Sequence, residues 1–503
     1  MMSGLLEDQR TAWVIAAVSF LLFLIGNLPW QLDDYDQAKQ GFTSFQMIKE
    51  GRWLYQQTPH AHVATKPPLV AWISGGLFGL TRSWDLAWRL PSFLAAVALA
   101  LLLFRSARSA YGLTAGLIAE AAFGLNLLSP RLATLVRTDM PLALVIFLIG
   151  ALIWQKIRAQ TEWRLRDQVY VFVLLTVAML IKGPIVYAFL LPGIGVFEWW
   201  RRRHAVVAGV GDPGQSHKVQ LEQSAWPGWW PWIASLVVFL LWVIGGILFQ
   251  PGFFDEVVMR EFVGRFGETI HRPQPLYFYL PHLLHKFAPW SLLMVAIALV
   301  DLHSRRWRLR SALRDMSPET FWLLCWSLGG VIVMSLIPSK RVDRIFPIIP
   351  PLCLLLAAQI GRHGAPRRLD ASALRPYLAI ALVVALLFTG SYTIWKVITG
   401  YRHHRDALAV FGRDVRREAA AHHWRYEVVS AKDEGLLLYL QKTHFIDPDH
   451  AIPEWNQGNL DALVASTEKA PSLMSRLPDA TLSQVRSNDR KKEQGSDYVL
   501  LIH

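Results

Sequence analysis

The sequence has few cysteines and few charged residues. Its only cysteines, Cys325 and Cys353, lie in apolar stretches, so the sequence predicts no disulfide framework. Charged residues make up 18% of the 503 residues, against roughly 25% in a typical soluble domain, whereas hydrophobic residues reach 53% and Trp residues number 22. This composition excludes a disordered chain, a disulfide scaffold and a collagen-like fibre, and it leaves more apolar surface than a soluble protein can bury.

Positive charge exceeds negative charge. The 51 Lys and Arg residues outnumber the 38 Asp and Glu residues, which gives a formal net charge of +13. On a soluble protein this balance would point to nucleic acid as a partner, but on a membrane protein it indicates cytoplasmic anchors and anionic headgroups. We therefore expect membrane lipids as partners, and no nucleic acid.

Apolar runs suited to crossing a membrane recur along most of the chain. A helix needs about 20 mostly apolar residues to cross about 30 Å of hydrocarbon. The first run, residues 11–30, has no small-residue cleavage site after it, so we expect a permanent span and not a signal peptide. Further runs lie at residues 69–81, 90–106, 112–128, 140–155, 168–181, 184–198, 229–249, 281–300, 320–337, 345–360 and 377–396. They predict an all-α polytopic membrane domain of about 11–13 transmembrane helices.

Basic residues in the connecting loops predict the orientation. They collect at residues 105–108, 156–166, 201–203, 305–314 and 362–375. Because cytoplasmic loops are rich in Lys and Arg, we expect these five clusters and the N-terminus in the cytoplasm. The loops alternate consistently between the cytoplasmic and the outer side only if the short run at 69–80 is re-entrant or lies in the outer interface.

The composition changes to mixed polar after residue 399. We expect residues 1–399 to form the transmembrane catalytic domain, with outer loops at 31–68 and 250–280. Residues 400–503 predict a small α/β domain on the outer face, with helices at 406–422 and 434–441 and strands at 426–430 and 498–502.

Polar residues gather at the predicted outer ends of the spans. They include Asp33, Asp34, Asp36, Gln37, Lys39, Lys66, Arg137, Asp139, Lys182, His271, Lys340, Arg341 and Arg344. Short outer loops are usually poor in Lys and Arg, and ionisable groups at membrane depth are costly, so these cations need a functional reason. Cations next to carboxylates would suit an anionic lipid phosphate beside an acid/base centre.

Each of these residues also has an ordinary interpretation when it is taken alone. The acidic residues around Asp36 are compatible with a solvated loop, and Lys182 with a side chain that reaches the headgroups. His271 in an exposed loop is compatible with simple solvation. The functional interpretation depends on all of them sharing one face of the membrane.

The motifs resemble those of a known family when they are taken in order. They are Asp36-Gln37-x-Lys39, Lys66-Pro67-Pro68-Leu69, Arg137-Thr138-Asp139-Met140-Pro141-Leu142, Lys182-Gly183-Pro184, the stretch from His271 to Pro281, and Ser339-Lys340 followed by Pro347 and Pro350-Pro351. Over residues 10–360 they resemble the GT-C-type integral-membrane glycosyltransferases, in particular the bacterial branch of lipid A aminoarabinose transferases and protein-mannosyltransferase-like enzymes.

The resemblance implies an inverting hexosyl- or pentosyltransferase in the bacterial inner membrane. The donor would be a polyprenyl-phosphate sugar, and the acceptor a lipid A, another glycolipid, a glycan or a protein of the envelope. Asp36 would be the catalytic carboxylate, acting as base towards an acceptor hydroxyl or orienting an acceptor that is already anionic, with Asp34 as its reserve and Asp139 as the second carboxylate. The expected donor-phosphate ligands are Lys66, Lys182, Lys340, Arg344, Lys39 and Arg341, and the expected substrate contacts are Gln37, His271 and Tyr279.

The chain departs from the family at two motifs. Relatives often carry Glu, sometimes with a bound metal, where this chain has Thr65 before Lys66-Pro67-Pro68. This departure argues against a divalent metal; the weak candidate ligands are His271, His60 and His62, and no cofactor is assigned. Gln37 and Lys39 stand where aminoarabinose transferases tend to have Glu and Arg, so neither the sugar nor the acceptor follows from the resemblance.

Two other classes of protein are compatible with parts of the pattern. A transporter or flippase for a lipid-linked or anionic solute would place charges or broken helices near the midplane of the membrane. A polysaccharide polymerase or ligase of another fold need not pair the Asp of the first loop with Lys-Pro-Pro. The charges here lie at span ends, which favours the glycosyltransferase.

Overall fold

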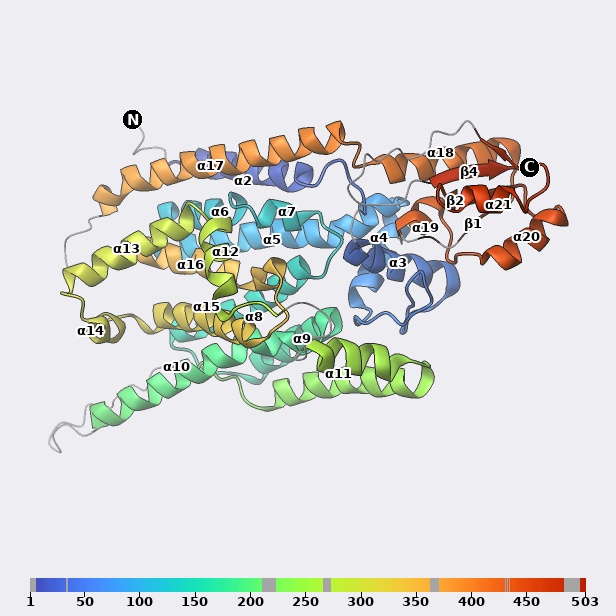
Figure 1. Cartoon of the computed structure of the whole chain (residues 1–503). Coiled ribbons are helices and arrows are strands. Elements are labelled where there is room, and N and C mark those ends of the chain that lie inside the picture. The colour runs from blue at the N-terminus through green and yellow to red at the C-terminus, as the bar shows by residue number, and fades with distance from the viewer. Residues whose placement is uncertain are drawn as a thin grey trace.

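Long apolar helices form most of the protein in the computed structural model (Figure 1). The structure describes residues 6–32, 35–209, 223–265, 273–361, 371–429, 431, 433, 435–483 and 498–503. Within these ranges, six helical segments are long and apolar enough to cross a membrane: α5 (Trp84–Tyr111), α8 (Asp139–Ala159), α11 (Trp230–Phe249), α15 (Pro318–Leu336), Val342–Ile360 and Leu374–Arg402. The protein is therefore a multi-pass membrane protein.

Shorter or bent elements account for the other apolar runs. The segment Leu276–Lys286 and the helix α13 (Trp290–Ser304) bend by 103° and would make a seventh span if they cross together. Leu276–Lys286 comprises η3 (Leu276–Phe278) and α12 (Tyr279–Lys286), Val342–Ile360 comprises η4 (Val342–Ile348) and α16 (Ile349–Ile360), and Leu374–Arg402 is part of α17 (Ala371–Arg402). The remaining elements of the helical body are α2 (Gln9–Ile25), α3 (Tyr35–Glu50), α4 (Leu69–Thr81), α6 (Leu113–Gly124), α7 (Ser129–Ala133), α9 (Leu165–Lys182), α10 (Ile185–Gly209), η1 (Phe254–Phe262), η2 (Val263–Arg265) and α14 (Leu309–Arg314). The count of 11–13 spans stays a prediction.

Prolines explain where the helices break. The apolar run at 281–300 is interrupted after Lys286, and the next helix begins at Trp290, directly after Pro289. The run at 11–30 likewise ends early, because α2 stops at Ile25, a few residues before Pro29. Proline lacks a backbone N–H and disfavours helical geometry at the preceding residue, so neither run continues as one straight helix.

The helical body has two distinct ends (Figure 1). The small helix α14 and the C-terminal part of α10 lie at one end, with the basic residues 201–203 and 305–314. At the opposite end lie α3, α4 and a small unit with a β-sheet, which follows α17. The separation agrees with the expected sidedness of these basic clusters; which end faces the cytoplasm stays a prediction.

The C-terminal unit is a four-stranded mixed sheet with helices around it. Its elements are α18 (Ala407–His422), β1 (Tyr426–Val428), α19 (Gly435–Leu440), α20 (Pro448–Asn456), β2 (Ala462–Ser466), α21 (Ala470–Met474), β3 (Thr481–Leu482) and β4 (Tyr498–Ile502). The strand order is β1-β2-β4-β3: β1 pairs with β2 in parallel, and β4 pairs with β2 and β3 in antiparallel register. The predicted α/β class is confirmed, and all five residues of β2 are buried.

Helix α3 is held between the helical body and the C-terminal unit. Its residues Phe42 and Phe45 are fully buried and share one apolar cluster with Trp88 of α5 and Leu438 of α19. A hydrogen bond reinforces the contact, because the backbone N–H of Leu32 donates to the Tyr439 hydroxyl at 2.7 Å. The C-terminal unit therefore fixes the start of α3. Helix α17 runs past residue 399, and the boundary expected there stays a prediction.

The apolar contact predicts the effect of truncating Leu438. Its side chain is 3% exposed, and its Cδ1 would lie 3.4 Å from the Cβ of any larger residue in place of Gly41 of α3. Leu438→Ala should lower the free energy of unfolding by about 2–5 kcal/mol, because it leaves a cavity at this interface. Denaturant unfolding in detergent and limited proteolysis of residues 400–503 measure it. The matched control is Leu482→Ala, 56% exposed in the same unit; equal losses in both variants would contradict the prediction.

Candidate active site

Asp36 lies in the first turn of α3, where the helix dipole favours a negative charge. Its Oδ2 accepts a hydrogen bond from Nη1 of Arg341 and lies 3.7 Å from Nη2 of Arg137. Burial raises the pKa of Asp36, but the charges of Lys66, Arg341 and Arg137 outweigh this effect and lower the pKa to about 2. The carboxylate is therefore ionised at neutral pH.

Arg137 connects Asp36 to a second carboxylate. Its Nη1 donates to Oδ2 of Asp343 at 2.8 Å, and both side chains are 8% exposed. Arg131 of α7 lies on the other side, with its Nη1 3.5 Å from Oδ1 of Asp343. One guanidinium thus joins the loop before α8, the start of α3 and the short helix η4.

Asp139 and Lys182 form a separate buried ion pair. Asp139 is the first residue of α8 and Lys182 the last residue of α9, and Lys182 Nζ donates to Asp139 Oδ1 at 2.5 Å. Lys66, just before the prolines that precede α4, is close enough to interact electrostatically with both Asp36 and Asp139. Lys66 therefore lies near both carboxylates.

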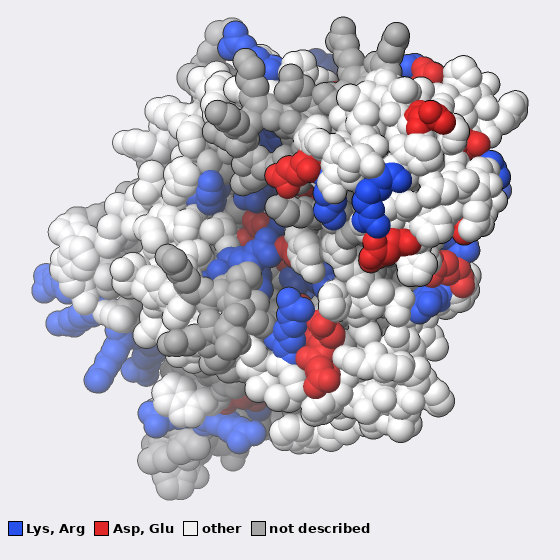
Figure 2. All heavy atoms as spheres, turned by 45° about the vertical axis from the view of Figure 1, so that its right-hand side comes forward, with Lys and Arg blue, Asp and Glu red and all other residues white. Residues whose placement is uncertain are grey.

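Arg344 completes what we call the charged cluster. Its Nη1 donates to the carbonyl oxygen of Ser339 at 2.7 Å, and its charge acts on Lys182 and on the fully buried Tyr279. The members of the charged cluster are Asp36, Lys66, Arg137, Asp139, Lys182, Arg341, Asp343 and Arg344. Figure 2 shows Lys and Arg side chains gathered in a hollow of this face, with Asp and Glu atoms behind them.

Three other expected site residues have local partners. Gln37 is buried and its Oε1 accepts from the backbone N–H of Val136 at 3.2 Å. Lys39 lies over the ring of Tyr35, with Nζ 5.6 Å from the ring centroid. Lys340 donates to the carbonyl oxygen of Gln274 at 2.8 Å, and burial lowers its pKa. Asp34 and His271 lie outside the described residues.

The weak metal candidates His60 and His62 have different neighbours. His60 stacks on Phe445 of the C-terminal unit with 5.2 Å between the ring centroids. His62 Nδ1 lies 3.3 Å from Oε1 of Glu256 in η1. In the part of the chain that the structure describes, no group of three or more His, Cys, Asp and Glu side chains is placed to hold a metal ion.

The structure adds residues that were not among the expected site residues. Arg137 and Asp343 stand inside motifs that the sequence did single out, at Arg137-Thr138-Asp139 and in the turn at 339–344. Glu261 stands in the predicted outer loop at 250–280, but nothing in the sequence pairs it with Thr65: its Oε1 accepts from the Thr65 hydroxyl at 2.9 Å, across 196 residues of chain. A carboxylate therefore does lie beside Lys66-Pro67-Pro68, supplied by the helical element η1.

Comparisons with known proteins identify a matching family model and a similar solved structure. The family model "Dolichyl-phosphate-mannose-protein mannosyltransferase" matches residues 65–210. The crystal structure of ArnT from Cupriavidus metallidurans bound to undecaprenyl phosphate superposes with a TM-score of 0.65 at 18% identity, over 98% of both chains. This chain has the GT-C glycosyltransferase fold.

Two curated relatives whose names describe an undecaprenyl phosphate-dependent transferase match parts of this chain. The undecaprenyl phosphate-alpha-4-amino-4-deoxy-L-arabinose arabinosyl transferase 1 of Sodalis glossinidius is 31% identical over 165 residues, which is 32% of this chain and 28% of that protein. The corresponding transferase of Serratia proteamaculans is 25% identical over 415 residues, 78% of this chain and 68% of that protein. The expected resemblance to the aminoarabinose transferases and the expected GT-C membrane domain are confirmed.

The Arg137–Asp343 pair predicts a stability difference between two carboxylate variants. Asp343→Asn removes one charge of a buried pair and leaves Arg137 with only the more distant contact to Asp36 at 3.7 Å, so we expect a loss of about 3–5 kcal/mol of unfolding free energy. Denaturant unfolding of the purified GT-C protein in detergent measures it. Asp414→Asn is the control, because Asp414 pairs with an Arg417 side chain that is 75% exposed, and we expect a loss of about 0–1 kcal/mol there. Similar losses for both variants would refute this role of the buried pair.

Proposed function

We propose that the protein transfers a sugar from a polyprenyl-phosphate donor to an envelope acceptor at the outer face of the bacterial inner membrane. The observation that carries the proposal is Asp36, held ionised among Lys66, Arg137 and Arg341 at the end of the helical body that carries the C-terminal unit. The relatives act on an undecaprenyl-phosphate sugar by their names, and the GT-C neighbour holds undecaprenyl phosphate.

Lys66 and Arg344 are suited to the donor phosphate. When the bond between sugar and phosphate breaks, negative charge develops on the phosphate oxygens, and cations aimed at them stabilise the leaving group. Lys66 acts electrostatically on Asp36 and Asp139, and Arg344 acts on Lys182, which is the ion-pair partner of Asp139. We assign Lys182 the further role of keeping Asp139 in place through their 2.5 Å ion pair.

The low pKa of Asp36 limits its chemistry. A carboxylate with a pKa of about 2 is a weak base at neutral pH, since an efficient general base titrates near the working pH. Its stronger contributions are electrostatic: it stabilises positive charge on an oxocarbenium-like sugar, and it holds Arg137 and Arg341 where they can bind an anionic acceptor. A single displacement of this kind would invert the anomeric centre.

The transporter alternative finds less support. Asp139 begins α8 and Lys182 ends α9, so this ion pair lies at helix ends and not halfway along a span. Asp36 belongs to α3, which is not among the helices suited to cross a membrane. A transport path would require such charges near the midplane, and none of the relatives named above is a transporter.

The first experiment compares the wild type with Asp36→Asn. We expect at least a hundredfold loss of transfer in Asp36→Asn, because the amide removes the charge that stabilises the sugar and positions Arg137 and Arg341. The protein should stay folded, because the shorter Arg137–Asp343 pair remains. Lys66→Ala should weaken use of the donor. Mass spectrometry of released polyprenyl phosphate, with purified protein, lipid-linked sugars and envelope acceptors, measures both effects.

Asp449→Asn serves as the control, since the Asp449 side chain is 79% exposed in the C-terminal unit. Full activity in Asp36→Asn would move the catalytic role to Asp34 or Asp139. Failure of the wild type to consume any lipid-linked sugar would reject the proposed function.

The pKa of Asp36 predicts the pH dependence of transfer. Because the pKa is lowered to about 2, the negative charge is present at neutral pH and is lost only as the pH falls through this value. We expect kcat/KM to show no acid limb from Asp36 between about pH 4 and 7. Arg341→Gln removes one stabilising cation, so it should raise the pKa of Asp36. A wild-type acid limb between about pH 5 and 7 that Arg341→Gln shifts upward would contradict this assignment.

A further inference from the structure

The carboxylates at the candidate site are all engaged by groups of the protein itself. Counting Glu261 beside Thr65, the described residues hold four of them, and each accepts a hydrogen bond. The pairs are Asp36 with Arg341, Asp139 with Lys182, Asp343 with Arg137, and Glu261 with the Thr65 hydroxyl. In three of the four pairs the donor is a cation. An ammonium group on a ligand would therefore have to compete with a positive charge that is already in place.

The sum of the charges at the site is positive. The charged cluster contains five cations and three carboxylates, and Glu261 adds a fourth carboxylate, so these described residues leave one positive charge. The phosphodiester that joins a sugar to a polyprenol carries one negative charge and neutralises it. An uncharged sugar keeps this balance, whereas an ammonium on the sugar would make the site positive again, in surroundings where charges interact strongly.

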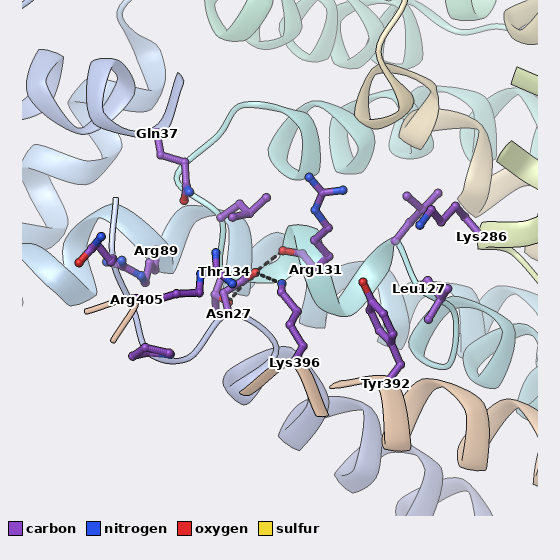
Figure 3. A pocket seen from close by; sticks show the side chains of 14 residues that line it. Asn27, Gln37, Arg89, Leu127, Arg131, Thr134, Lys286, Tyr392, Lys396 and Arg405 are labelled. Atoms are coloured by element: carbon purple, nitrogen blue, oxygen red, sulfur yellow. Dashed lines mark hydrogen bonds between the residues drawn. The ribbon is translucent and has the colours of Figure 1, made fainter. Parts of the chain in front are cut away.

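The space next to the site is positive too. A cavity reaches Gln37 of α3 (Figure 3), and the cations that line it are Arg89, Arg131, Lys286, Lys396 and Arg405. Its described lining residues include no carboxylate. Arg131 connects this cavity to the charged cluster, because its Nη1 lies 3.5 Å from Oδ1 of Asp343. The surroundings thus add to the repulsion that an ammonium on the sugar would meet.

Helix α3 presents a neutral amide beside Asp36. Gln40 lies four residues after Asp36, so both side chains project from the same face of the helix, with Cβ atoms about 5–6 Å apart. The Gln40 side chain is 6% exposed, and within the described ranges its amide makes no hydrogen bond. An amide that is nearly buried without a partner is costly, and a sugar hydroxyl, which both donates and accepts, would satisfy it.

The neighbouring groups of α3 already have contacts of their own. Gln37 is directed into the adjoining cavity in Figure 3, and the Thr43 hydroxyl donates to the backbone carbonyl of Gln40 at 2.8 Å. One turn further along, Met47 packs so closely on Gly75 of α4 that a larger residue there would clash with it. Gln40 is therefore the polar side chain of α3 that is best placed to meet a sugar next to the catalytic carboxylate.

We propose that the transferred sugar is uncharged and that Gln40 binds one of its hydroxyl groups. The proposal rests on the proposed function, and it separates this chain from the relatives whose names specify an amino sugar. Positive charge develops on the sugar ring while its bond to the phosphate breaks, and Asp36 stabilises that charge. A permanent ammonium would compete for the same carboxylate in the ground state. An uncharged sugar leaves Asp36 to act on the transition state alone.

The test compares two donors that differ at one position of the sugar. Undecaprenyl phosphate-alpha-L-arabinose has a hydroxyl where undecaprenyl phosphate-alpha-4-amino-4-deoxy-L-arabinose has an ammonium, and the glucose, galactose and mannose esters extend the uncharged set. Purified protein in detergent is titrated with each donor, and native mass spectrometry counts bound lipid. Release of undecaprenyl phosphate with envelope acceptors gives kcat/KM. We expect the arabinose donor to bind about tenfold or more tightly than its amino counterpart, and an uncharged donor to give the highest kcat/KM.

Two substitutions of Gln40 test its role. Gln40→Ala should lower kcat/KM for the best uncharged donor by about five- to tenfold, and change binding of undecaprenyl phosphate, which has no sugar, less than about twofold. Gln40→Glu places a carboxylate on the sugar side of α3, so it should raise the preference for the amino donor by about fivefold or more. The matched control is Gln457→Ala, an exposed glutamine of the C-terminal unit, which should leave all values unchanged. Thermal unfolding of each variant shows that the protein is still folded.

Three results would overturn the proposal. The sugar is not restricted to an uncharged one if the wild type uses the amino donor at least as well as every uncharged donor. Gln40 does not recognise the sugar if Gln40→Ala weakens binding of undecaprenyl phosphate as much as that of the sugar donors, or changes neither. If the wild type neither binds nor consumes any donor of the set, the proposed function itself fails, an outcome distinct from the first two because they require a donor that is used.

Discussion

One guanidinium, that of Arg137, lies between two carboxylates, and the geometry of the candidate site depends on it. Asp343 on one side belongs to η4 and Asp36 on the other to α3, so three segments far apart in the sequence meet at a single side chain. Arg suits this role because its planar group offers several N–H donors and stays charged when buried. Removing the charge of Asp343 would leave Arg137 with only the more distant carboxylate of Asp36 to offset its charge at a buried position.

The same constraint explains how many cations can gather at one end of the protein. Lys66, Lys182, Arg341 and Arg344 would repel one another, but Asp36 and Asp139 lie among them and partly neutralise them. The remaining positive charge is available to phosphate.

Much of the fold could be predicted from the sequence, because apolar runs and basic loops report directly on membrane helices. Asp36 and Lys66 could be named because they stand in motifs of a known family. Contacts between residues far apart in the sequence could not be predicted. Nothing near Thr65 indicates a contact with Glu261, and nothing near Gln31 indicates that Gln31 lines a cavity. The strand β2 was also not predicted, because a short run of small, mostly apolar residues such as Ala462–Ser466 has no clear hydrophobic period.

The hydrogen bond from Leu32 to the Tyr439 hydroxyl joins residues that are 407 positions apart. During synthesis, α3 therefore leaves the ribosome long before the surface that it packs against. At about 5–20 residues per second the interval is roughly 20–80 s. Throughout that time the membrane helices can insert and pack, but the start of α3 lacks its final support. A nascent chain thus acquires a properly positioned Asp36 only after its C-terminal unit has been made and has folded, which makes assembly of the site one of the last events in the biogenesis of the protein.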